Sequence, residues 1–221
     1  MITEQIKNRV QSIVNIFETG SPEGDYSNIS IFSDGPGNSK QITYGRSQTT
    51  EFSSLNELVE MYVNADGEFS KALKPYVGRI GKRPSLYLNE VFKSLLRKAG
   101  KDEVMKKTQD SFFDKVYWTK AFNFFKDNGF TNPLSLLVIY DSFIHGGLSI
   151  VRKKFSEKTP SNGGNEKKWI SDYCVARRSW LENHPRKILH STAHRPALFS
   201  KEIKKGNWDM SEKIPVEQYF V

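Results

Sequence analysis

One apolar run near the middle of the chain, NPLSLLVIYDSFIHGG, most restricts what this sequence can fold into. Asn132-Pro133 is typical of a helix start, and Gly146 is typical of a helix end, so the run predicts one helix between them. That helix is shorter than the roughly 18 apolar residues that span a membrane, and no other stretch approaches this length. It is therefore expected to lie buried in a core, which a chain of 221 residues is long enough to build.

Other segments predict further helices around one small sheet. Apolar residues recur at helical spacing from about Thr3 to Glu18, and Gly20 indicates the stop. The strand-like segments YSNISIF and KQITYGR flank the turn-rich SDGPGNS, which predicts a β-hairpin between about Ser27 and Arg46. Four more helical segments are expected: one opened by a capping box at Ser54 and Glu57, one from Pro84 through Leu95, one over 102–126 and one over 166–181.

Composition narrows the class of protein. Hydrophobic residues make up 37% of the chain, which is typical of a globular protein. The lone Cys174 cannot form an internal disulfide. The amino-terminal segment has charged residues among its apolar ones and lacks the apolar core of a signal peptide. The fold class expected is α+β, mostly α, with a small antiparallel sheet near the amino terminus.

The net charge of +8 favours an anionic partner such as a nucleic acid, a membrane surface or a cell-wall polymer, although many soluble proteins are basic for no specific purpose. Basic clusters occur at 152–154 and 204–205, and no nucleic-acid motif accompanies them. The histidines at 184, 190 and 194 lack the spacing of zinc ligands. We therefore expect no nucleic-acid partner, no metal and no cofactor.

Three residues near the amino terminus carry the groups that glycosidic hydrolysis requires. Glu18 ends the first predicted helix, Asp34 lies in the hairpin loop, and Thr43 lies in the following strand. One carboxylic acid must protonate the leaving oxygen, and a second, charged carboxylate must activate water or stabilise the sugar cation. Spacing alone favours an ordinary Asp-Gly turn at Asp34 and a solvated helix residue at Glu18 over a catalytic pair.

The order Glu, then Asp-Gly, then Thr-x-Gly, followed by LNELVEMY, resembles the catalytic region of family 46 chitosanases. It is similar, more loosely, to the pattern of phage-type lysozymes, which share the same fold superfamily. Three later segments, IYDSFIHGG, YCVARRSWL and STAHRPALF, resemble further parts of family 46. The resemblance implies a single lysozyme-like domain over residues 1–221, with two lobes and a central cleft.

The resemblance also implies residue roles. Glu18 matches the general acid, Asp34 the general base of an inverting reaction, and Thr43 the hydroxyl that helps place the attacking water. A buried aspartate that joins arginines corresponds to Asp141, with Arg177 and Arg195 as the expected partners. The register leaves Arg178 as an alternative to Arg177. Asp25 and Glu51 remain open as carboxylates that assist or replace Asp34.

The substrate implied is a β-1,4-linked aminosugar polymer that an endo-acting glycoside hydrolase would cleave. The family's glucosamine-binding aspartate is replaced here by Ser53 or Ser54, and the basic charge suits peptidoglycan, so muramidase activity is expected slightly ahead of chitosanase activity. Substrate contacts are expected from Arg46, Gln48 and His145. The alternatives are a glycan-binding relative without activity and a basic nucleic-acid-binding module.

A cell-wall hydrolase would act outside the producing cytoplasm, in cell-wall degradation with an antibacterial role. A lysozyme without a visible leader is compatible with a phage lysin or a secreted toxin. Secretion machinery and an immunity or inhibitor protein are then expected as partners.

Overall fold

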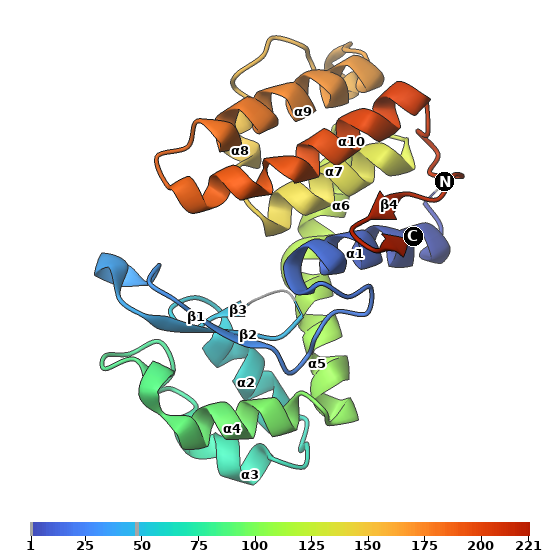
Figure 1. The fold of residues 1–221 in the computed structure, drawn as a ribbon. Helices are drawn as coiled ribbons and strands as arrows, with labels where there is room; N and C mark the ends of the chain where they lie inside the picture. Colours follow the sequence, from blue (N-terminus) through green and yellow to red (C-terminus); the bar gives the residue numbers. More distant parts are fainter. Residues whose placement is uncertain (1, 47–48) are drawn as a thin grey trace. The chain divides into compact units, whose positions relative to one another are not determined.

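A computed structural model describes residues 2–46 and 49–221 and divides the chain into two compact units (Figure 1). One unit, which we call the helical unit, consists of Met1–Phe17 and Val116–Val221. The other, which we call the sheet unit, is Glu18–Lys115. Helices predominate, and the three-stranded sheet lies near the amino terminus, so the predicted fold class is confirmed.

The sheet has the order β1-β2-β3, with both pairs antiparallel: β1 (Ile29–Phe32), β2 (Gln41–Tyr44) and β3 (Thr49–Thr50). Strands β1 and β2 form the predicted hairpin, with Ser30 opposite Thr43. The third strand, in which Thr50 pairs with Thr43, was not predicted, because two threonines are too short a run to show alternation.

In the described part of the sheet unit, the sheet is accompanied by the helices α2 (Leu55–Asn64), α3 (Ser70–Leu73), α4 (Glu90–Ala99) and α5 (Glu103–Phe113). Short 3₁₀ turns lie at Pro36–Asn38, Lys74–Tyr76 and Leu86–Leu88. The core of this unit is apolar, and Ile42 and Tyr44 of β2 contribute two fully buried side chains to it. The Tyr44 hydroxyl donates to the Leu96 carbonyl oxygen at 2.7 Å, which fixes β2 against α4.

Two details of the predicted helix starts are wrong. Ser54 precedes α2 but makes no capping bond, because its backbone (φ −106°, ψ 5°) is not extended as a cap requires. The helix predicted from Pro84 begins at Glu90 instead. There the Asn89 side chain accepts from the Phe92 amide at 2.9 Å, so Asn89 supplies the cap.

The helical unit surrounds the central apolar helix. Its helices are α1 (Glu4–Thr19, as far as Phe17), α6 (Thr119–Asp127), α7 (Pro133–Ile144), α8 (Leu148–Val151), α9 (Glu166–Glu182) and α10 (His194–Lys205). Helix α7 packs against α6, α9 and α10 (Figure 1). Nine consecutive residues of α7, from Leu134 to Ser142, are buried, as the sequence predicted.

The remaining predicted helices also form, with local variations. A π-helical turn at Asp114–Trp118 joins α5 to α6 within the predicted helix 102–126, and a 3₁₀ segment at Lys187–Ala193 precedes α10. Another 3₁₀ turn lies at Pro160–Asn162, and β4 (Pro215–Val216) pairs with β5 (Tyr219–Phe220). Among the described residues, no helix combines the length and apolarity needed to cross a bilayer.

Candidate active site

Asp34 lies in the exposed loop between β1 and β2, and a buried glutamine holds its carboxylate. Gln41 Nε2 donates to Asp34 Oδ1 at 2.8 Å, and Gln41 Oε1 accepts from the Phe52 amide at 3.1 Å. Because Gln41 is only 5% exposed and is bonded at both ends of its amide, its orientation is fixed. The Asp34 carboxylate is therefore accessible to solvent and positioned by a neutral donor.

Thr43 follows Gln41 by two residues along β2, so the two side chains point to the same face of the strand. Ile42 and Tyr44 point to the opposite face, where they join the core. Thr43 is 3% exposed, and its Oγ1 makes no hydrogen bond within the described part of the chain. A buried hydroxyl without a partner is costly, so this hydroxyl needs an explanation beyond packing.

Glu18 lies in the last turn of α1 and is half-buried. The residue before it, Phe17, offers its carbonyl oxygen to Arg195 Nη2 at 3.1 Å. The Arg195 guanidinium also lies over the Phe17 ring, 5.1 Å from its centroid. Arg195 therefore fixes the backbone that immediately precedes Glu18. The separation of about 6.5–9.5 Å that an inverting pair needs between Glu18 and Asp34 stays a prediction.

The two competing carboxylates have other environments. Glu51 is fully buried, and it accepts from the Ser85 hydroxyl at 2.6 Å, the Leu86 amide at 2.7 Å and the Ile42 amide at 3.2 Å. Its lone pairs thus hold the sheet to the segment that precedes α4. Asp25 is exposed, and its Oδ1 accepts from the Ser27 amide at 2.8 Å in a local turn.

Asp141 of α7 is completely buried and lies between two arginines, as expected. Its Oδ2 accepts from Arg177 Nη1 at 2.6 Å, and its Oδ1 accepts from Arg195 Nη1 at 3.1 Å. Burial alone would raise the pKa of the Asp141 carboxyl, but the charges of Arg177 and Arg195 outweigh it, and the pKa lies below its usual value. Asp141 is therefore an ion-paired carboxylate.

The geometry also resolves the register on α9. Arg177 is fully buried and, besides Asp141, donates to the Ser142 hydroxyl at 2.9 Å. Arg178 is on the surface, where its Nε donates to Glu182 Oε1 at 2.8 Å. Of the two candidates, Arg177 is the partner of Asp141.

The three predicted substrate contacts fall in different places. Arg46 is buried and pairs with Asp110 on α5, and Tyr26 and Phe113 lie beneath its guanidinium. Gln48 lies outside the described residues. His145 is half-buried beside Arg177, with Nδ1 3.3 Å from Arg177 Nη2. Burial and the charge of Arg195 lower the pKa of His145 to about 4. Substrate contact by these residues stays a prediction.

Sequence reasoning missed Gln41 and Asp110. Gln41 carried a usable signal, because it lies two residues before Thr43 on a short strand and therefore shares the face of that threonine. Asp110 carried none, since its pairing with Arg46 depends on how α5 packs against the strand end.

Comparison with known proteins identifies related sequences. Residues 12–214 match the profile of glycosyl hydrolase family 46. A chitosanase of Bacillus subtilis (strain 168) is 27% identical over 229 residues, which cover 95% of this chain and 81% of that protein.

Two solved structures share the fold. The native chitosanase from Bacillus subtilis MY002 aligns with a TM-score of 0.84 and 22% identity over 100% of both chains. A Gynuella sunshinyii chitosanase in complex with chitotetraose aligns with a TM-score of 0.80 and 22% identity, over 100% of this chain and 98% of that one.

Proposed function

The chain belongs to glycosyl hydrolase family 46 and is a glycoside hydrolase, and from this premise we propose that it cleaves β-1,4 bonds within chitosan, with inversion at the anomeric carbon. The relatives named above are chitosanases, and one of them was solved with chitotetraose. Peptidoglycan, which the sequence slightly favoured, gains no support from these relatives, and neither does an immunity protein as partner.

The charge argument for peptidoglycan also weakens when the charge is divided between the units. The sheet unit has 14 acidic and 14 basic residues, whereas the helical unit has 11 acidic and 19 basic ones. The whole surplus of +8 therefore belongs to the helical unit. The unit that holds Glu18, Asp34 and Thr43 is neutral, so it does not favour an anionic polymer over a cationic one.

One observation supports the mechanism most: Gln41 holds Asp34, and it shares a face of β2 with the unpartnered hydroxyl of Thr43. In the proposed reaction, Asp34 takes a proton from water, and the Thr43 hydroxyl orients that water. Glu18 donates its proton to the glycosidic oxygen as the bond to the anomeric carbon breaks. The water oxygen attacks from the opposite face of the sugar, so the product anomer is inverted.

The buried ion pairs have a positioning role in this proposal. Arg195 binds Asp141 with one nitrogen and the Phe17 carbonyl oxygen with another, so it links α7 to the end of α1. Arg177 completes the neutralisation of Asp141 from α9. This network orders the backbone next to Glu18 without taking part in proton transfer.

The test is to incubate the protein separately with chitosan and with peptidoglycan sacculi and to identify the products by mass. We expect chitosan oligomers, and proton NMR recorded early in the reaction should show the inverted anomer. Glu18→Gln should abolish the release of oligomers while the protein remains folded. Release of muropeptides with no action on chitosan would overturn the substrate, and full activity of Glu18→Gln would overturn the assignment of the acid.

A further inference from the structure

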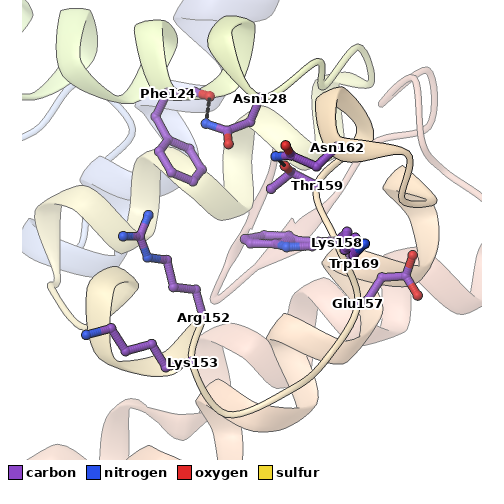
Figure 2. Close-up of a pocket in the computed structure, with 9 residues that line it drawn as sticks. All are labelled: Phe124, Asn128, Arg152, Lys153, Glu157, Lys158, Thr159, Asn162 and Trp169. Atoms are coloured by element: carbon purple, nitrogen blue, oxygen red, sulfur yellow. Dashed lines mark hydrogen bonds between the residues drawn. The ribbon is translucent and has the colours of Figure 1, made fainter.

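The helical unit contains a pocket of about 590 Å³ that the catalytic proposal does not use (Figure 2). Phe124 of α6 and Asn128, which follows that helix, border it on one side, Arg152 and Lys153 follow α8, and Trp169 comes from α9. The volume is in the range of pockets that hold small organic ligands. None of the residues assigned above to acid, base or ion-pair network lines it.

The aromatic part of the pocket is rigid. The Trp169 ring is stacked on Tyr173, with centroids 5.2 Å apart and an interplanar angle of 5°, and it meets Phe130 edge-on at 5.1 Å. Phe124 packs edge-on against Phe143 at 6.0 Å. Trp169 is only 2% exposed, so it forms part of a fixed apolar wall. Phe124 is half-buried, so it is the aromatic side chain of this wall that is accessible to a sugar ring.

The polar part of the pocket is cationic and unpaired. Arg152, Lys153 and Lys158 are exposed, and none of them makes a side-chain hydrogen bond or ion pair to another described residue. The one carboxylate in the lining, Glu157, is already engaged, because Oε1 accepts from the Asn165 amide at 2.8 Å and Oε2 lies 3.7 Å from Lys168 Nζ. Figure 2 shows the Arg152 side chain reaching across the opening toward Phe124.

We propose that this pocket binds an acidic saccharide, a sugar ring that carries a carboxylate or phosphate group, without cleaving it. The ring would lie against Phe124, and the anionic group would meet Arg152 and Lys158. An arginine fork matches the geometry of both anions. Chitosan, whose amino groups are cationic, would be repelled by the cationic side chains of this pocket, so the proposed substrate is not its ligand. The proposal does not depend on the activity proposed above.

The experiment is a calorimetric titration of the full chain, at low salt, with digalacturonate and with glucose 6-phosphate. These two probes distinguish a carboxylate from a phosphate ligand. Cellobiose serves as the neutral sugar, and inorganic phosphate as the anion without a ring. We expect at least one acidic sugar to bind about tenfold more tightly than either control, and its affinity to fall as salt is added.

Matched variants test the location. Replacing Arg152 and Lys158 together by Gln should weaken binding of the acidic sugar by about tenfold or more. The control replaces Lys187 and Lys213 by Gln; both are exposed residues of the helical unit outside the pocket, and the change in net charge is the same. This control should bind as the wild type does, and both double variants should keep wild-type activity on chitosan.

Three results would overturn the proposal. One is that neither acidic sugar binds at millimolar concentration. Another is that inorganic phosphate binds as tightly as the acidic sugars, which would leave only a site for anions. The third is an equal loss of affinity in the two double variants, which would show that net charge and not the pocket is responsible. Because chitosan cleavage is measured separately, failure here leaves the catalytic proposal standing.

Discussion

Asp34 and Asp141 are both aspartates of the proposed active site, yet they differ in burial and in the groups that contact their carboxylates. Asp34, in the sheet unit, is exposed and accepts one hydrogen bond from a neutral amide. Asp141, in the helical unit, is fully buried, and two guanidinium groups neutralise it. A base must be able to take up a proton, so an aspartate paired with two arginines is unsuited to the task. We therefore propose a catalytic role for Asp34 and a structural role for Asp141.

The two units also differ in net charge. The sheet unit is neutral in total, while the helical unit carries the surplus of eight positive charges. Glu51 is also buried in the sheet unit, where two backbone amides and a hydroxyl donate to the carboxylate. Environment, and not residue type, separates the carboxylate proposed as the base from the structural ones.

The strongest test of this contrast is Asp34→Asn. The substitution keeps the shape of the side chain and an oxygen that accepts from Gln41, but it removes the proposed base. We expect the rate of chitosan cleavage to fall by roughly 10²–10⁴-fold, with an unchanged melting temperature. Initial rates of reducing-end release and a thermal melt would measure both quantities.

Asp25→Asn is the matched control, since Asp25 is exposed and the hydrogen bond that its side chain accepts from the Ser27 amide survives in the amide. It should retain nearly full activity. If Asp25→Asn were inactive and Asp34→Asn active, the base would be Asp25 and the comparison above would fail.

The second test removes the structural aspartate. Asp141→Ala leaves Arg177 and Arg195 buried without their counter-ion, so we expect the free energy of unfolding to fall by roughly 3–5 kcal/mol. Urea denaturation followed by far-UV circular dichroism measures this loss. Glu182→Ala breaks only the exposed pair with Arg178, so it should cost less than about 1 kcal/mol. Equal effects of the two substitutions would contradict the structural role of Asp141.

The sequence predicted the parts of the fold that periodicity encodes. The amphipathic helix before Gly20, the hairpin and the buried helix α7 each follow from a local pattern and form where expected. Strand β3 was not predicted because it depends on pairing with β2. The helix start at Asn89 was not predicted because it depends on a single capping side chain.

The candidate site was predictable only in part. The arginine partners of Asp141 followed from the resemblance together with the rule that a buried carboxylate needs a cation. The burial of Arg46 against Asp110 did not follow, because it requires knowing that α5 packs beside the end of β2. The hydrogen bond from Gln41 to Asp34 did not follow either, because it requires knowing how the loop between β1 and β2 folds.

The third test uses pH and concerns His145, which lies beside the arginines of the Asp141 network. Burial and the charges of Arg195, Arg177 and His194 lower its pKa from 6.5 to about 4, although Asp141 opposes this. The unfolded chain therefore takes up the proton first as pH falls. Stability should be complete above about pH 6.5 and should decline toward pH 4, by on the order of 3 kcal/mol in total.

Urea unfolding at several pH values between 4 and 7 measures this decline. His145→Gln cannot titrate, so its stability should change much less over the same window. A wild-type stability that is flat from pH 6.5 to 4 would show that the folded protein protonates His145 as readily as the unfolded chain does.

The smallest expected effect returns to the sheet unit and to Gln41. Gln41→Met keeps the length of the side chain but removes both hydrogen bonds, so the Asp34 carboxylate is no longer held toward the face of Thr43. A misplaced base slows the chemical step more than it weakens substrate binding, and we expect kcat to fall by about tenfold with little change in KM. Gln218→Met, at an exposed position of the helical unit, is the control and should be neutral. Steady-state kinetics on a defined chitosan oligomer, with a thermal melt of each variant, separate the two possible roles. If Gln41→Met lowered the melting temperature but left kcat unchanged, the glutamine would only stabilise the loop, and Asp34 would find its working position without it.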